Sequence, residues 1–185
     1  MFDIVFFGKP GSWKWTQAEL LRDALGSQIS HLSTGDIFRA LTAKPNPIGD
    51  YVTDRMNAGF LIDDSVTISL FNAYFYTVVD SNKAMLLDGY PRTMQQMDAF
   101  LNLCTEQGRK VIGINFELDD ETTVERMMAR AREWEDETVM KVRLEQYYHH
   151  THPLVERFAQ AFPLYNIDAS PSIEEIHAEV RKLVS

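Results

Sequence analysis

FDIVFFGKPGSWKWT, residues 2–16, is the stretch that decides the fold of this chain. Residues 2–7 form an apolar run of strand length, and a glycine-containing turn separates them from a helical pattern that starts near Trp15. A strand that passes through such a turn into a helix brings free backbone N–H groups and the positive end of the helix dipole together. The stretch therefore predicts an α/β fold with an anion site at the carboxyl end of its first strand.

Short apolar runs of the same kind recur along the chain. They lie at residues 84–87, 111–116 and 164–167, with a weaker, more polar candidate at 28–32, and helical patterns separate them. Strands that alternate with helices form a parallel, doubly wound sheet. We therefore predict a three-layer α/β/α sandwich around a five-stranded parallel sheet, as one domain over residues 1–185.

The composition limits the possible partners. The chain has 18 basic and 27 acidic side chains and a net charge of −9, which argues against a broad surface for nucleic acid or anionic membrane. A phosphate site must therefore gather its positive charge locally. Cys104 is the only cysteine, so no disulfide can form within the chain, and no apolar run is long enough to span a membrane. We expect a cytoplasmic protein that binds neither nucleic acid nor membrane.

Three polar motifs fall at the ends of predicted strands: GKPGSWKWT at residues 8–16, STGDIFR at 33–39, and DGYPRT at 88–93. Ligands of parallel sheets bind beyond the carboxyl ends of the strands, so these motifs should converge. Asp88 is suited to hold Mg²⁺ through water, and Arg92 to neutralise a transferring group. Each motif alone could be an ordinary turn or helix cap, but the ordered set favours a phosphate site.

Two helical stretches are too long for simple connections. Residues 36–63 read as helices around a turn at 45–49, which predicts an inserted subdomain. Residues 122–148 are helical with a charge-dense break at 132–136, which we interpret as a short lid.

The last helix, at 172–184, opens with a capping box of Ser172 and Glu175. Three histidines at 149, 150 and 152 could suggest a metal site, but their spacing favours a polar surface.

In this order and at these strand ends, the motifs resemble the adenylate kinase family of nucleoside monophosphate kinases, over essentially the whole chain. The resemblance implies that an acceptor-binding segment at 33–63 and a short lid at 126–138 flank the phosphate loop. It also implies that Lys14 binds the β- and γ-phosphates of ATP and that Gln96 reads adenine. The other ATP-site residues implied are Gly8, Pro10, Gly11, Ser12, Trp13, Trp15, Thr16, Arg126 and Arg130. The other AMP-site residues implied are Thr34, Gly35, Arg39, Phe60, Leu61, Ile62, Gly89, Arg92, Arg132 and Arg143.

The reaction implied by the resemblance is in-line transfer of a phosphoryl group from Mg·ATP to AMP, giving ADP, without a covalent intermediate. Its catalytic residues would be Lys14, Asp88, Arg92, Arg126, Arg132 and Arg143. The lid arginines could instead belong to a solvated pair of helices held by salt bridges. Mg²⁺ is expected to bind with ATP, no zinc is expected, and relatives with this layout are usually monomers.

Two positions bear on the acceptor. The amide of Gln96 can present both a donor and an acceptor to a purine edge. Thr34 stands where relatives that accept pyrimidines typically have alanine. AMP is therefore favoured over UMP or CMP as the acceptor.

Trp13 and Trp15 depart from the family pattern, which has glycine on both sides of Lys14. The backbone there must approach phosphate closely and can require dihedral angles that a side chain resists. Three interpretations stay open: a working kinase whose loop adapts, a nucleotide-binding protein without catalysis, and codons that the organism reads as glycine, as some genetic codes read UGA. Arg92, Arg126, Arg132 and Asp88 keep the family pattern, which favours the kinase.

Overall fold

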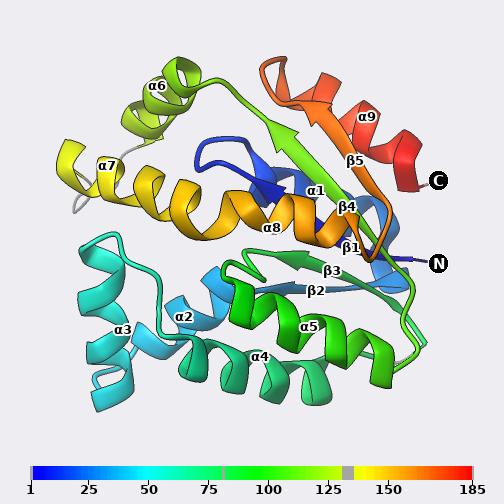
Figure 1. The fold of residues 1–185 in the computed structure, drawn as a ribbon, viewed down its shortest axis with the longest axis horizontal. Coiled ribbons are helices and arrows are strands. Elements are labelled where there is room, and N and C mark those ends of the chain that lie inside the picture. The colour runs from blue at the N-terminus through cyan, green and yellow to red at the C-terminus, as the bar shows by residue number, and fades with distance from the viewer. Residues whose placement is uncertain (1, 81, 131–135, 185) are drawn as a thin grey trace.

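The computed structural model describes residues 2–80, 82–130 and 136–184, with the side chain of Arg130 left aside. Five parallel strands form one sheet in the order β2-β3-β1-β4-β5 (Figure 1). Their bounds are Asp3–Gly8 (β1), Ile29–Ser33 (β2), Ala84–Asp88 (β3), Val111–Glu117 (β4) and Leu164–Asp168 (β5). All five runs expected from the sequence are strands, and the predicted α/β fold is confirmed.

Helices cover both faces of the sheet (Figure 1). The helices that pack on it or extend from it are α1 (Lys14–Leu25), α2 (Thr34–Thr42), α3 (Pro47–Asn57), α4 (Asp64–Val78), α5 (Met94–Glu106), α6 (Asp120–Arg130), α7 (Glu137–Gln146), α8 (His152–Ala159) and α9 (Ile173–Val184). A 3₁₀ turn at Gly26–Gln28 precedes β2, and a π-helical turn at Tyr147–Thr151 joins α7 to α8. The predicted capping box of Ser172 and Glu175 is confirmed, because each side chain bonds to the other residue's backbone N–H.

Alternation along β1 builds two cores, one on each face of the sheet. Val5 and Phe7 join the apolar cluster beneath α4, α5 and α8, whereas Ile4 and Phe6 join the cluster beneath α1 and α9. All six residues of β1 are buried, as expected of a central strand covered on both faces. The strand that carries the glycine-containing turn is therefore covered on both faces and paired along both edges, with β3 and with β4.

The sheet order sets the position of the site. From β1 the chain crosses to β2 and returns to β3 on one side, and then continues to β4 and β5 on the other. A ligand cleft is expected at such a switch in direction, beyond the carboxyl ends of the strands. The turn after β1 and the segments that follow β2 and β3 all lie at this edge.

Two helical arms extend from that edge (Figure 1). The inserted segment forms α2 and α3, drawn in cyan, and the second arm consists of α6 and α7. Residues 132–135 of the break that we interpret as a lid, and with them the expected site residue Arg132, lie outside the part of the chain that the structure describes. No helix among the described residues is both long and apolar enough to cross a membrane.

Candidate active site

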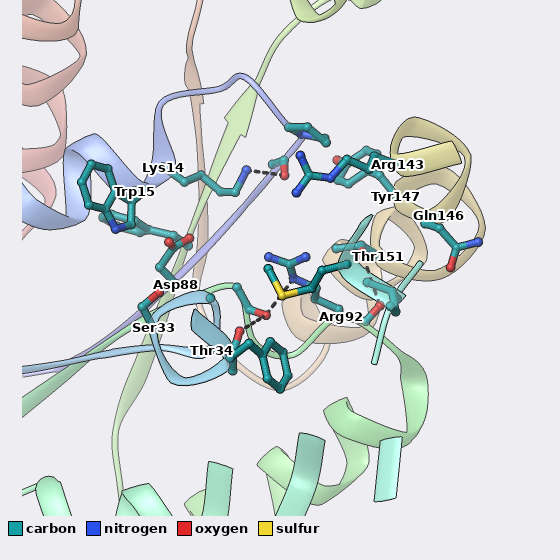
Figure 2. A pocket seen from close by; sticks show the side chains of 18 of the residues that line it. Lys14, Trp15, Ser33, Thr34, Asp88, Arg92, Arg143, Gln146, Tyr147 and Thr151 are labelled. Carbon is teal, nitrogen blue, oxygen red and sulfur yellow. Dashed lines mark hydrogen bonds between the residues drawn. The ribbon is translucent and has the colours of Figure 1, made fainter. Parts of the chain in front are cut away.

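A cavity of about 470 Å³ opens at the carboxyl edge of the sheet, between the two arms (Figure 2). The expected site residues that line it are Gly8, Pro10, Gly11, Ser12, Trp13, Lys14, Trp15, Thr34, Gly35, Arg39, Phe60, Leu61, Ile62, Asp88, Gly89, Arg92, Gln96 and Arg143. Residues separated by more than 100 positions in the sequence therefore share one cavity. Thr16 and Arg126 do not belong to its lining.

The loop after β1 wraps around the ammonium group of Lys14. Its Nζ donates to the carbonyl oxygen of Gly8 at 2.7 Å and to that of Lys9 at 2.6 Å, and lies 3.1 Å from Oγ of Ser12. Ser12 is fully buried and donates to the carbonyl of Lys9 at 2.8 Å. The first turn of α1 has no side-chain cap, so its N–H groups face the loop as an anion site would require.

Trp13 has a left-handed backbone, with φ of 61° and ψ of 12°, directly before α1. Within the described chain it is the one residue other than glycine with positive φ. The conformation disfavours any side chain and suits glycine. Its indole packs against the core beneath α1 and α9, with the guanidinium carbon of Arg126 5.5 Å from the ring centre.

Arg126 points toward the loop after β5 in this structure. Its guanidinium donates to the carbonyl oxygens of Ala169 and Ser170 at 2.6 and 2.8 Å. Together with the contact to Trp13, these bonds hold the side chain beside the loop after β1, outside the cavity lining. A move into the cavity would require exchanging three protein contacts for a ligand.

The segments after β2 and β3 meet through Gly89. Thr34, which is 3% exposed, donates from Oγ1 to the Gly89 carbonyl at 2.8 Å, and Nε of Arg92 donates to the same oxygen, also at 2.8 Å. The carbonyl of Gly89 thus fixes both a hydroxyl and a guanidinium at the cavity floor. Figure 2 shows Thr34, Arg92 and Asp88 on this side and Arg143 on α7 opposite.

Arg92 is exposed to the cavity, although many protein atoms lie around its guanidinium. Desolvation by these atoms lowers the pKa of Arg92; Asp88 acts in the opposite sense and Arg39 in the same sense. A guanidinium exposed to a cavity can form charge-assisted hydrogen bonds with an incoming anion. The floor of the cavity is therefore suited to a phosphate.

Gln96 is 2% exposed, and both ends of its amide are bound. Oε1 accepts from the backbone N–H of Arg92 at 2.8 Å, and Nε2 donates to Oδ1 of Asp64 at 2.8 Å. Thr93 caps α5 and donates to the same oxygen of Asp64 at 2.8 Å. Gln96 thus lines the cavity with a fixed orientation.

Sequence reasoning missed several lining residues, among them Phe38, Met56, Thr67, Met140, Gln146, Tyr147 and Thr151. Tyr147 is buried, which raises its pKa to about 12, and Thr151 donates to the Arg92 carbonyl at 3.1 Å. The last three belong to the α7 end and the π-helical turn, which no sequence pattern distinguishes from a regular helix. Their position in the cavity lining arises only from tertiary packing.

The three histidines in this region lie on exposed positions beside Tyr147 and Tyr148. Among residues 2–80, 82–130 and 136–184, no group of three or more histidine, cysteine or acidic side chains is arranged to hold a metal ion. The described lining accordingly combines cations and backbone N–H groups with two acids, Asp36, which pairs with Arg39, and Asp88 at the end of β3, which is 8% exposed.

Comparison with known proteins identifies the family of the chain. The family model described as adenylate kinase matches residues 6–162. The chain is 36% identical over 180 residues to an adenylate kinase of Corynebacterium glutamicum, covering 97% of each chain. It is 36% identical over 183 residues to that of Parasynechococcus marenigrum, covering 98% of each, and 31% identical over 190 residues to that of Trichodesmium erythraeum, covering 100% of this chain and 98% of the relative. This chain therefore belongs to the adenylate kinase family and is a nucleotide-binding phosphotransferase.

Proposed function

We propose that the cavity transfers the γ-phosphoryl group of ATP to AMP, giving two molecules of ADP, in a reversible reaction. The observation that carries this proposal is the gathering of Lys14, Arg39, Arg92 and Arg143 around one cavity of a protein whose net charge is −9. Four cations from four separate elements have no structural need to share one cavity. They suit a ligand with several phosphates.

The donor would bind at the loop after β1. The backbone N–H groups at the start of α1 and the ammonium of Lys14 would contact its β- and γ-phosphates, with Gly8, Pro10, Gly11, Ser12 and Thr16 shaping the loop. Lys14 would exchange its bonds to two loop carbonyls for bonds to phosphate oxygens. Arg126 and Arg130 would join from α6.

The acceptor would bind between β3 and the α2–α3 arm. Arg39 and Arg92 would hold its phosphate, Thr34 and Gly89 would shape the floor, and Phe60, Leu61, Ile62 and Gln96 would surround the base. We assign residues 33–63 to this acceptor segment and residues 126–138 to the lid that carries Arg132 toward the phosphates. The chemistry requires alignment of the two substrates and neutralisation of charge, and no residue needs to form a covalent intermediate.

Adenylate kinases use Mg²⁺ together with ATP, and Asp88 fits a role in holding it. Its carboxylate ends β3 beside the loop, in a position suited to bind a hydrated ion through water. The ion would neutralise phosphate charge when bound. No side chain of the protein would coordinate the Mg²⁺ ion directly, and zinc is not required. We also propose that the protein is a cytoplasmic monomer.

We further propose that glycine is the residue that functions at positions 13 and 15. The left-handed backbone at position 13 supports this, because it costs a tryptophan roughly 1–3 kcal/mol that a glycine does not lose. Inspection of the two codons and the mass of the peptide spanning residues 11–22, isolated from the source organism, test the proposal. UGG codons together with a tryptophan mass would contradict it.

The kinase proposal is tested by a coupled assay of ADP formation from ATP and AMP, with UMP as the control acceptor. The protein with tryptophan at positions 13 and 15 and the Trp13→Gly/Trp15→Gly variant are measured side by side. We expect AMP-dependent turnover, greater in the glycine variant by about tenfold or more, because relief of roughly 1.4 kcal/mol in the transition state is tenfold in rate. The absence of AMP-dependent turnover in both proteins would refute the proposed function.

A further inference from the structure

Gln96 is held by one hydrogen-bond donor and one hydrogen-bond acceptor, and together they restrict which base its amide can recognise. A side-chain amide has one end that only accepts and one end that only donates. Asp64, as a carboxylate, can only accept, and the backbone N–H of Arg92 can only donate. These two neighbours therefore permit one orientation of the amide and oppose the flipped one.

The lock extends to a third residue. As the cap of α5, the hydroxyl oxygen of Thr93 accepts a hydrogen bond from the backbone N–H of Gln96 at 3.2 Å. The hydroxyl hydrogen of Thr93 is then donated to Oδ1 of Asp64. The same oxygen accepts from Nε2 of Gln96. Asp64 is thus fixed by Thr93 at the first position of α4, and a flip of Gln96 would bring its oxygen against that carboxylate.

Each end of the fixed amide can still form one more hydrogen bond. Nε2 has a second hydrogen and Oε1 a second lone pair, and Gln96 lines the cavity. Adenine presents an acceptor at N1 beside a donor at N6, whereas hypoxanthine presents a donor at N1 beside an acceptor at O6. An amide that can flip serves both bases, but a locked amide serves only one.

We propose that Asp64 is a specificity-determining residue that acts through Gln96. By fixing the amide, it makes the acceptor site select a 6-amino purine monophosphate over a 6-oxo purine monophosphate. The proposal rests on the AMP-binding role proposed above. Asp64 is a positioning residue, because it reaches Gln96 and Thr93 and not the nucleotide.

The test compares the dissociation constants of AMP and IMP by calorimetry, without ATP, so that the phosphate loop does not enter. IMP is the suitable probe because it differs from AMP only at the edge that Gln96 faces. In the Asp64→Asn variant the new amide can present oxygen or nitrogen to Gln96, so the backbone N–H of Arg92 remains as the one partner that favours the original orientation, and the lock is weakened. We expect the preference for AMP over IMP to fall by about tenfold, the magnitude typical of one hydrogen bond to a charged group.

Asp98→Asn is the matched control. Asp98 lies exposed on α5, two residues after Gln96, and pairs with Arg157 at 3.7 Å instead of with Gln96. The control loses the same charge close to Gln96, outside the proposed acceptor segment, and should keep the preference of the unmodified protein. Asp64→Ala, which removes the acceptor without placing a donor there, should also lower the preference and replaces the asparagine variant if that variant does not fold.

The outcomes separate this inference from the proposed function. An unchanged AMP-to-IMP ratio in both Asp64 variants would overturn the inference, as would an unmodified protein that binds IMP as tightly as AMP. An unmodified protein that prefers AMP and loses this preference on substitution of Asp64, yet shows no turnover with ATP, would leave the inference standing and remove the kinase proposal.

Discussion

Asp3 joins three parts of the sheet through one buried carboxylate. Asp3 is 3% exposed. It accepts from the backbone N–H of Met85 on β3 at 2.7 Å and from Nη2 of Arg109 at 2.7 Å. Arg109 also donates to the carbonyl oxygen of Lys83 at 3.0 Å. The hydrogen bond to Asp3, together with the charge of that carboxylate, raises the pKa of Arg109. A buried ion pair contributes little net stability, but the loss of one member leaves the other without compensation.

We therefore expect Asp3→Asn to lower the free energy of unfolding by about 3 kcal/mol, measured by urea denaturation. Asp80→Asn is the matched control, because Asp80 is exposed and lies 3.7 Å from Lys83. The control should change stability by less than about 1 kcal/mol. Equal losses of unfolding free energy in the two variants would mean that the buried ion pair contributes no more to stability than the exposed pair.

At the scale of helical elements, the two arms touch at Gly59. This residue has φ of +79°, and a Cβ added to it would lie 3.0 Å from the Val139 carbonyl of α7 and 3.3 Å from Cγ of Arg143. The turn after α3 can approach α7 this closely only without a side chain. Phe60, Leu61 and Ile62 follow directly, so the contact also sets the position of the proposed base-binding segment.

We expect Gly59→Ala to weaken AMP binding about threefold to tenfold, because the added methyl group pushes the turn away from α7 and strains its backbone. Gly108→Ala is the matched control. Gly108 also has positive φ, +60°, but nothing lies within 4 Å of its added Cβ. Both variants should lose stability in thermal unfolding from the positive φ, Gly59→Ala by more because of its close contacts, and only Gly59→Ala should lose AMP affinity in calorimetry. Equal affinities would argue against a role for the contact between the arms.

At the scale of the whole molecule, burial of weak acids predicts a sensitivity to alkaline pH. Burial raises the pKa of Cys104 to about 12 from its ordinary value of 9.0, and raises the pKa of Tyr147 to about 12. The folded protein therefore holds protons that the unfolded chain releases above about pH 9. By linkage, stability is full below that pH and is lost as pH rises through the interval to about 12.

We expect the free energy of unfolding to fall between pH 8 and pH 10.5, with about 2 kcal/mol of the loss due to Cys104. Urea titrations at the two pH values measure it. The Cys104→Ala variant, in which this thiol is absent, should show a correspondingly smaller loss. A variant whose stability falls as steeply as that of the unmodified chain would refute the assignment to Cys104.

The sequence predicted the strands well because each is a buried apolar run ended by turn residues, and even the weak candidate at 28–32 corresponds to β2, Ile29–Ser33. It also indicated which segments share the cavity, because parallel strands bring their carboxyl ends together. It could not indicate that Arg126 binds the carbonyls of Ala169 and Ser170, or that Thr151 reaches Arg92. Those contacts join positions more than 40 residues apart and depend on packing that no local pattern encodes.

The pairing of α1 with α9 has a consequence for synthesis on the ribosome. Ala18 and Leu21 of α1 are fully buried in a cluster that also contains Ile176 and Val180 of α9. A ribosome produces α1 well before α9, so the part of this face that α9 covers stays exposed while about 150 further residues are made, whereas β1, β2 and β3 can cover the rest earlier. The nascent chain should therefore be a client of chaperones that shield apolar helices until α9 emerges from the exit tunnel.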